Sequence, residues 1–258
     1  MLVVVSPAKR LDLKPVEIAA PSQPAFQEDA STLAGYARKL SVAELRKLMR
    51  ISDSLARLNA GRFAEFADTP TADATKPAVL AFAGDTYTGL DAATLDDHAM
   101  TWAQAHLRIL SGLYGVLRPL DLIQPYRLEM GSRLKTQRGG SLYEYWGPRI
   151  AEALKDASCA AGTDILVNCA SVEYFSAVER RTLGLRVITP VFVEDRQGTT
   201  RIVSFFAKKA RGAMARFMVE NHLTDPATLK EFDTGGYRFE AGLSEGDRWV
   251  FRRACPEA

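Results

Sequence analysis

Three short apolar runs, at residues 2–5, 79–82 and 165–169, constrain the fold of this chain more than any other feature. Each run is followed by polar or turn-forming residues, which is the pattern of a strand buried on both faces. Long stretches with helical periodicity lie between the runs. Strands of this kind, interleaved with helices, predict an α/β protein whose central sheet is covered by helices.

Helix signals fill the segments between these runs. Ser41, followed three residues later by Glu44, is a capping box and predicts a helix over 42–50. Ser52 or Asp53 is a suitable N-cap for a helix that extends to about residue 66. Further helices are predicted over 31–40, from 96 or 97 to 110, over 141–157 and over 208–221, and hairpins over 186–206 and 237–253.

The domain organisation follows from the absence of any dividing feature. No internal repeat, low-complexity stretch or shift in composition separates one part of the 258 residues from another. The strands and helices do not alternate regularly, as they would in a βαβ array. We therefore predict a mixed α/β fold, a single compact domain over 1–258 with a mixed central sheet wrapped by helices. Two smaller domains remain the alternative at this length.

Several classes of protein are disfavoured by what the sequence lacks. No apolar run approaches the ~20 residues of a membrane-spanning helix, and the first residues do not form a signal peptide. We expect a cytoplasmic protein with no membrane partner. The three cysteines form no CxxC pair, and the three histidines have no ligand cluster near them in the sequence. Neither a disulfide framework nor a metal site is expected, and no cofactor is predicted.

The distribution of charge is more informative than the net charge of +2. Residues 200–216 carry five basic side chains and no acidic one. Three of them, Lys208, Lys209 and Arg211, lie where a predicted strand leads into a helix, and a helix N-terminus favours anions. Positive side chains there cost about 0.3–1 kcal/mol, which suggests that they bind a phosphate. The alternative is a solvated face whose lysines cover neighbouring phenylalanines.

A second basic segment surrounds a pair of glycines. Gly112 and Gly115 follow a predicted helix, and Arg118 comes shortly after them. Helix, tight glycine turn and short second helix together are the plan of a helix-hairpin-helix element, whose backbone N–H groups bind phosphate without reading sequence. The second glycine comes one residue later than in the usual motif. A helix that ends at Gly112, followed by a plain turn, is the alternative.

A third group of polar residues follows the three predicted strands. Its members are Lys9, Asp85, Tyr87, Asn168, Ser171 and Glu173. If the strands are parallel neighbours, these side chains meet at one edge and, with Arg127 and Glu129, form a pocket for a phosphorylated or nucleotide-like small molecule. No phosphate-binding loop, dinucleotide fingerprint or nucleophile elbow identifies a reaction, so catalysis stays open. Cys169 is either a reactive thiol or, more commonly for such a position, a buried one.

Seven segments, in order along the chain, carry a family resemblance. They are SPAK at 6–9, LMRIS at 48–52, GDTYTGL at 84–90, HLRILSGLYGVLRPLD at 106–121, QPYRLEMG at 124–131, NCASVEY at 168–174 and AKKARG at 207–212. These segments closely resemble the bacterial YaaA family. The resemblance runs from residue 1 to about residue 221, and beyond that point only a closing hairpin is shared.

The resemblance implies a cytoplasmic protein of the oxidative-stress response, which confers peroxide resistance and limits damage caused by intracellular iron. It also implies DNA binding, a positively charged cleft, a helix-hairpin-helix element and a mixed α/β fold peculiar to the family. In this sequence the element corresponds to 110–118, and the cleft to Lys208, Lys209 and Arg211, with Arg118 and Arg127.

Two functional hypotheses follow. The first is a protein that binds the phosphate backbone of double-stranded or branched DNA and protects that DNA or aids its repair. The alternative is an enzyme that acts on a phosphorylated or nucleotide-like ligand at the strand ends.

Overall fold

A parallel core forms the centre of an eight-stranded mixed sheet. The computed structural model describes residues 1–16, 18, 20–196 and 199–254. Strand β1 (Leu2–Val5) is central and runs parallel to both β5 (Leu107–Ser111) and β8 (Ile165–Cys169). All four residues of β1 are fully buried, so helices or loops cover both faces of the sheet. The strands predicted at 2–5 and 165–169 are confirmed.

The sheet extends on both sides of this core. On one side the order continues through β9 (Arg186–Arg196) and β12 (Arg248–Ala254), which are both parallel to the core, to β11 (Arg238–Phe239). The short strand β10 (Thr199–Arg201) pairs with β9 in an antiparallel hairpin, and β11 pairs with β12 in the same way. The predicted terminal hairpin is confirmed. The predicted hairpin that follows residue 186 is present, but its second strand was placed at 201–206 and is wrong there, because β10 ends at Arg201 and α11 begins at Ser204. Residues 197–198 and Cys255 lie outside the described part of the chain.

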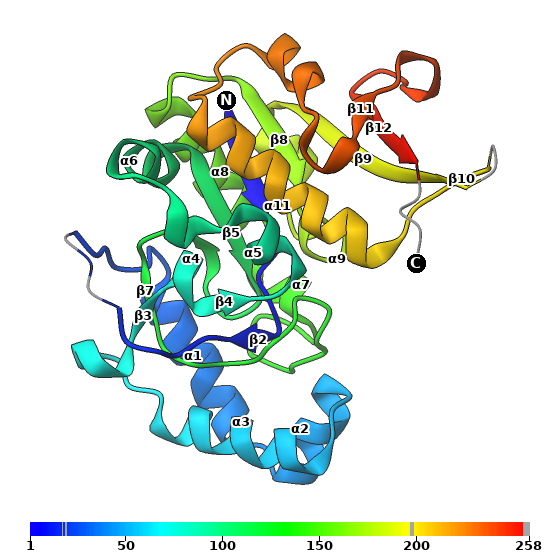
Figure 1. Cartoon of the computed structure of the whole chain (residues 1–258). Helices are drawn as coiled ribbons and strands as arrows, with labels where there is room; N and C mark the ends of the chain where they lie inside the picture. The colour runs from blue at the N-terminus through cyan, green and yellow to red at the C-terminus, as the bar shows by residue number, and fades with distance from the viewer. Residues whose placement is uncertain (17, 19, 197–198, 255–258) are drawn as a thin grey trace.

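Helix α11 (Ser204–Glu220) crosses in front of the sheet in Figure 1. It packs closely on α5 (Asp85–Leu90), because both helices have a glycine where they meet. A Cβ atom on Gly212 would lie 1.8 Å from the Thr86 carbonyl oxygen, and one on Gly89 would lie 2.0 Å from the Lys209 carbonyl oxygen. Only glycine therefore permits this approach. α6 (Asp97–His106) also packs against α11, and α8 (Arg149–Ala160), which follows the short helix α7 (Leu142–Trp146), packs against α6.

Three helices form a separate layer below the sheet in Figure 1. They are α1 (Gln27–Arg38), α2 (Val42–Met49) and α3 (Asp53–Glu65). The predicted capping box is present, since the Ser41 hydroxyl accepts from the Glu44 amide and the Glu44 carboxylate accepts from the Ser41 amide. Of the two predicted N-cap candidates, Ser52 is the residue that caps α3. The remaining short helices are α9 (Val172–Phe175) and α10 (Arg180–Leu183).

The prediction of a strand at 79–82 is wrong. This segment is the short helix α4 (Ala78–Ala81), set between the two-residue strands β3 (Lys76–Pro77) and β4 (Phe82–Ala83). β3 pairs with β7 (Leu122–Ile123), and β4 pairs with β2 (Arg10–Leu11), so neither belongs to the main sheet. A short apolar run fits a buried helical turn as well as a strand, and periodicity alone does not separate them.

The predicted helix-hairpin-helix is also wrong. α6 ends at His106, and the chain continues as β5, turns at residues 112–114 and returns as β6 (Gly115–Leu117) in an antiparallel hairpin. A Cβ on Gly112 would lie 2.3 Å from the Leu128 carbonyl oxygen, and Gly115 has φ +66° and faces Trp146. Both glycines are buried by these neighbours. Neither can present its backbone to a phosphate.

Two smaller boundaries also differ from the prediction. The helix predicted over 141–157 is interrupted at Gly147, which has φ +49° and separates α7 from α8. α11 begins at Ser204, so Lys208 and Lys209 lie in its second turn instead of at its N-terminus.

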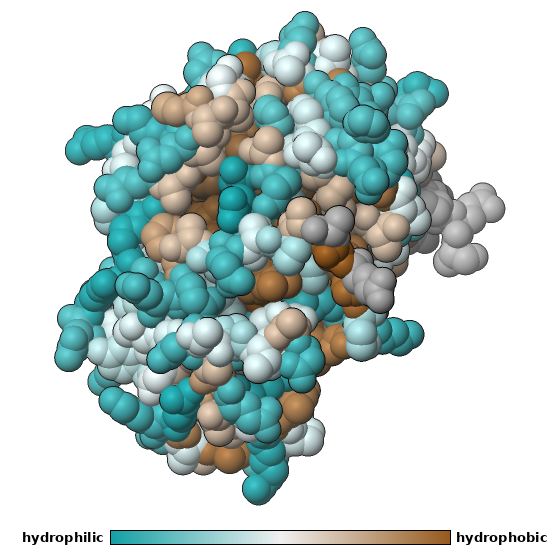
Figure 2. Space-filling view, turned by 90° about the vertical axis from the view of Figure 1, so that its left-hand side faces the viewer, coloured by the Kyte–Doolittle hydropathy of each residue, from teal (hydrophilic) through white to brown (hydrophobic). Residues whose placement is uncertain are grey.

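In Figure 2, hydrophilic residues cover most of the visible face, and apolar residues show mainly as small separate areas. No helix of the described residues has the length and apolarity needed to cross a bilayer.

Candidate functional site

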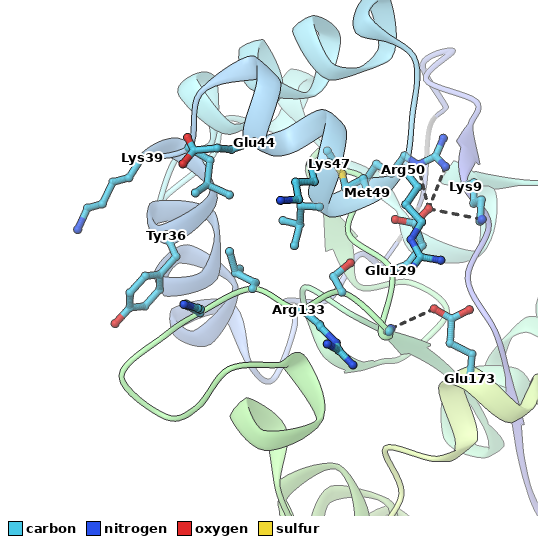
Figure 3. Close-up of a pocket in the computed structure, with 17 residues that line it drawn as sticks. Lys9, Tyr36, Lys39, Glu44, Lys47, Met49, Arg50, Glu129, Arg133 and Glu173 are labelled. Atoms are coloured by element: carbon cyan, nitrogen blue, oxygen red, sulfur yellow. Dashed lines mark hydrogen bonds and ion pairs between the residues drawn. The ribbon is translucent and has the colours of Figure 1, made fainter.

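An open groove of about 1020 Å³ lies between the three-helix layer and the loop at 127–135 (Figure 3). One wall comes from α1 and α2, and the other comes from the loop. The inner end is closed by residues near the carboxyl ends of β1 and β8. The side chains that carry charge in this groove are Lys9, Lys39, Glu44, Lys47, Arg50, Arg127, Glu129, Arg133, Lys135 and Glu173.

The helical wall is positioned by local sequence. The Ser41–Glu44 capping box fixes the start of α2, and Arg50 ends it in a left-handed conformation with φ +52°. Between these points Leu45 and Met49 are buried, so Lys47 is turned toward the groove. Lys39, just after α1, extends at the outer end of the groove (Figure 3).

The opposite wall is an irregular loop whose residues alternate between buried and exposed. Ser132 and Leu134 are buried, whereas Arg133 and Lys135 are exposed. The Ser132 amide donates to the Glu129 carbonyl oxygen, and the Ser132 carbonyl oxygen accepts from Leu142 at the start of α7. The loop is therefore held at Ser132 while its neighbours extend outward. Figure 3 shows Arg133 on the wall that faces Lys47.

Positive charge dominates the groove. Seven basic and three acidic side chains line it, a formal charge of +4. Five of the basic side chains are exposed and form no ion pair with any described residue: Lys39, Lys47, Arg50, Arg133 and Lys135. Cations that outnumber the carboxylates around them and line two facing walls create a positive potential that attracts anions.

The inner end of the groove is different, because its charges are paired. Glu129 accepts from the Arg127 guanidinium, with Nη2 2.9 Å from Oε1, and the ammonium of Lys9 lies 3.6 Å from the same oxygen. The other oxygen of Glu129, Oε2, is buried and has no hydrogen-bond partner among the described residues. Glu173 accepts from the Gly131 amide at 3.0 Å (Figure 3). The acidic groups here are thus largely occupied by the protein itself.

Behind this end, the carboxyl edges of β1 and β8 are joined by hydroxyl groups. The Ser6 hydroxyl donates to the Ser171 hydroxyl at 3.3 Å and accepts from the Ser171 amide at 2.8 Å. The Tyr87 hydroxyl donates to the Ser6 carbonyl oxygen at 3.1 Å, and burial raises the pKa of Tyr87 well above its ordinary value. Asp85, on the same helix as Tyr87, lies 3.9 Å from the ammonium of Lys208.

The strand-end residues predicted from sequence therefore lie near one edge of the sheet, although their surroundings differ. Lys9 and Glu173 line the groove, and Tyr87 and Ser171 lie directly behind it. Asp85 and Tyr87 reach this edge on α5 instead of following a strand of the main sheet. Asn168 is buried, and its side-chain oxygen accepts from the Ala170 amide, so it shapes the turn after β8.

The five predicted basic residues are not brought together. Arg127 lines the groove, but its guanidinium is paired with Glu129. Arg118 pairs with the buried Asp121 at 3.1 Å and also donates to the Gln23 carbonyl oxygen, away from the groove. Three residues lie on α11 and do not line the groove: Lys208, Lys209 and Arg211. The five predicted residues belong to stretches of chain with a surplus of basic residues. Lys39, Lys47 and Arg50 were not predicted, because acidic residues are interspersed among them.

The comparisons with known proteins agree with the motifs. The model of the family described as peroxide stress protein YaaA matches residues 1–243. The chain belongs to this family. Similar proteins include a UPF0246 protein of Ruegeria pomeroyi, 64% identical over 253 residues that cover 98% of both chains. A UPF0246 protein of Roseobacter denitrificans is 59% identical over 258 residues, 99% of both chains. One of Dinoroseobacter shibae is 59% identical and covers 100% of this chain and 97% of its own.

The resemblance to the YaaA family that the sequence motifs indicated is thus confirmed. The segments that carry it, although far apart in sequence, supply Lys9, Tyr87, Arg127, Ser171 and Arg211 to the groove or to the adjoining sheet edge. Cys169 ends β8 within the same region. Burial raises the pKa of its thiol to about 12, and the nearby positive charge of Arg211 acts against this shift. The thiol is therefore protonated near neutral pH, as the alternative of a buried cysteine expects.

Within the ranges that the structure describes, no group of three or more His, Cys, Asp or Glu side chains could hold a metal ion. The groups that line the groove are mainly exposed ammonium and guanidinium groups, with a few carboxylates. Such groups bind oxyanions.

Proposed function

We propose that this member of the peroxide stress protein family binds DNA through the phosphate backbone in the groove between α1–α2 and the loop at 127–135. One observation carries the proposal. Five exposed cations without carboxylate partners line this groove on two walls: Lys39, Lys47, Arg50, Arg133 and Lys135. Each can replace a counterion on a phosphate, and the release of that counterion favours binding regardless of base sequence.

The acidic residues at the inner end are compatible with such binding. Glu129 is neutralised by Arg127 and Lys9, and Glu173 is occupied by the Gly131 amide. Their negative charge therefore opposes a phosphate less than free carboxylates would. The proposal gives Arg127 a supporting part and gives none to Gly112, Gly115, Lys208 or Lys209. Double-stranded or branched DNA held in this way would be covered against attack by peroxide-derived radicals or kept in place for repair.

A charge-reversal series tests the proposal. Lys47→Glu, Arg50→Glu and Arg133→Glu should each weaken binding to all DNA sequences alike. Each lost contact should lower the slope of log affinity against log salt by about 0.9 for duplex DNA. Lys155→Glu is the matched control, because Lys155 is exposed on α8 and does not line the groove. A triple groove variant that keeps its affinity at low salt would exclude this groove as the DNA site.

A second candidate function is an enzyme or binding protein for a phosphorylated small molecule. The observation that favours it is the contact between Ser6 and Ser171, which joins the carboxyl edges of two parallel strands directly behind Lys9 and Glu173. In open α/β sheets, small ligands bind outside the carboxyl ends of the strands. Purified protein that retains a small phosphorylated molecule, identified by mass spectrometry after denaturation, would support this function.

A further inference from the structure

The guanidinium of Arg211 forms no ion pair and donates no hydrogen bond to any residue that the structure describes. It is half-buried and lies in the second turn of α11, a helix that packs against both β1 and β8. The Cys169 thiol at the end of β8 is the ionisable group whose charge acts on it. Burial lowers the pKa of Arg211, and only the Cys169 thiol acts in the opposite direction. Because that thiol is protonated near neutral pH, it does not neutralise the guanidinium.

The other arginines of the protein show that this is unusual. Eight arginines of the described residues are buried or half-buried, and for seven of them a protein oxygen accepts a hydrogen bond or forms an ion pair. Arg211 has no such partner within the described part of the chain. Removing a charged group from water is costly unless an opposite charge or acceptor replaces the water. The seven arginines with acceptors are Arg62, Arg108, Arg118, Arg127, Arg149, Arg216 and Arg253.

Further donors lie at the same edge. The register pairs Val5 of β1 with Cys169 of β8, and Ser6 and Ser171 follow these residues. Since Ser6 donates to Ser171, the hydroxyl hydrogen of Ser171 has no acceptor among the described residues. Lys208 precedes Arg211 by one turn on the same face of α11, and the only described carboxylate near its ammonium is that of Asp85 at 3.9 Å. Two donors without an acceptor among the described residues, the Arg211 guanidinium and the Ser171 hydroxyl, thus belong to the elements around the end of β8.

The topology favours a ligand at this position. β1 has β5 on one side and β8 on the other, and the chain visits β5 first. The direction in which strands are added therefore reverses next to β1, and such a switch point opens a crevice at the carboxyl ends of the strands. The Ser6–Ser171 pair lies at that end. Arg211 belongs to α11, which packs on β1 and β8, and its charge interacts with Cys169, the last residue of β8.

We propose that the carboxyl edge of β1 and β8 binds the oxyanion group of a small molecule, a phosphate or a carboxylate, through the Arg211 guanidinium. Ser171 donates its free hydroxyl hydrogen, and Lys208 supplies a second positive charge. A planar guanidinium presents two parallel N–H groups to two oxygens of either anion. This inference rests on the second candidate function only in placing a small ligand at the strand ends, and it does not require DNA binding.

Inorganic phosphate and acetate are the probes, each measured by isothermal titration calorimetry at constant ionic strength with chloride as the replaced ion. Wild-type protein should bind one of them saturably. Arg211→Met, which keeps the volume but removes the charge, should weaken this binding by about tenfold or more. Lys209→Gln removes an exposed charge two residues away and should change it by no more than about twofold. Preference for phosphate or for acetate identifies which oxyanion the site selects.

Two outcomes would overturn the inference. One is the absence of saturable binding of either anion to folded wild-type protein, and the other is binding by Arg211→Met as tight as that of the wild type. If Arg211→Met does not fold, Ser171→Ala serves as the second variant. An unchanged affinity of Ser171→Ala for the anion would contradict the proposed role of Ser171 in the site. Groove variants such as Arg50→Glu should retain anion binding, so loss of DNA binding and loss of the anion site are separable. Anion binding without any turnover would remove an enzymatic function and leave the site in place.

Discussion

The carboxylate of Glu173 accepts a hydrogen bond from the backbone amide of Gly131, with 3.0 Å between the nitrogen and Oε1. This bond connects α9, the helix after β8, to the loop that forms one wall of the groove. The same helix is held a second time, because the Tyr143 hydroxyl donates to the Glu173 carbonyl oxygen at 2.9 Å. The position of Arg133 and Lys135 in the groove therefore depends on residues at the edge of the sheet. This dependence can be measured.

Glu173→Ala should loosen the loop at 127–135 and reduce the free energy of unfolding by about 1 kcal/mol, because the bond is charge-assisted but exposed. Hydrogen exchange at the Gly131 amide should accelerate more than exchange in the buried strand β1. Glu152→Ala, an exposed glutamate on α8, is the control. Unchanged exchange at Gly131 would show that the Glu173 contact does not hold the loop.

The close contact of α5 and α11 predicts a large asymmetry between two glycine substitutions. Gly212→Ala places a methyl group 1.8 Å from the Thr86 carbonyl oxygen, so the helices must separate, and a loss of about 3 kcal/mol or more is expected. Gly35→Ala in α1 meets no atom within 4 Å and should stabilise the helix by about 0.5–1 kcal/mol. Chemical denaturation of both variants provides the comparison, and equal effects would contradict the packing.

Asp29 predicts an acid-sensitive link between α1 and α8. Burial acts to raise its pKa, but hydrogen bonds from Arg149 and Tyr145 and the positive charge of Arg149 outweigh burial, so the pKa is lowered from its ordinary value of 3.8. A lowered pKa in the folded state contributes stability that is present above the unfolded value and is lost as the pH falls through the folded value.

Unfolding free energies of wild type and Asp29→Asn, measured between neutral pH and pH 2.5, should therefore differ most near neutrality and converge at the acid end. The variant should show a flatter acid limb, because it lacks the carboxylate that must be protonated. Parallel curves over the whole range would mean that Asp29 does not contribute to acid unfolding.

The two described cysteines should differ in reactivity. Cys159 is exposed on α8, whereas Cys169 is buried, and burial raises the pKa of its thiol to about 12. Iodoacetamide at pH 8 should label Cys159 in the native protein and leave Cys169 unmodified until the protein is unfolded, since only the thiolate reacts. Peptide mass spectrometry gives the result for each site. Rapid native labelling of Cys169 would contradict its burial.

Local signals in the sequence predicted the elements that local chemistry controls. The Ser41–Glu44 pair and Ser52 fixed two helix starts correctly, since a cap satisfies backbone N–H groups within its own turn. The segment at 110–119 was misread because its fold depends on distant partners. Trp146 covers Gly115 and donates to the Gly112 carbonyl oxygen, so a residue more than 30 positions later closes the hairpin.

The candidate site was predictable only in part for the same reason. Polar residues that follow strands could be expected to meet, and Ser171 and Lys9 do lie at one edge. The groove, however, combines Lys47 of α2 with Arg133 of a loop that shares no periodicity with it. A count of charge along contiguous windows does not detect cations that only tertiary packing brings to facing walls.

The buried residues of the three-helix layer and of the sheet form one hydrophobic core, so the width of the groove depends on how these helices pack against the rest of the fold. Arg38 joins α1 to the end of α3 by donating to the carbonyl oxygens of Phe63 and Phe66, and the Phe63 side chain is fully buried. A substitution that changes the volume of Phe63 must be accommodated by the residues packed around it, and that adjustment can change the spacing of the groove cations although none of them is replaced. Core substitutions in this layer are therefore also substitutions of the binding site, because they act on the distance between Lys47 and Arg133 on its two walls.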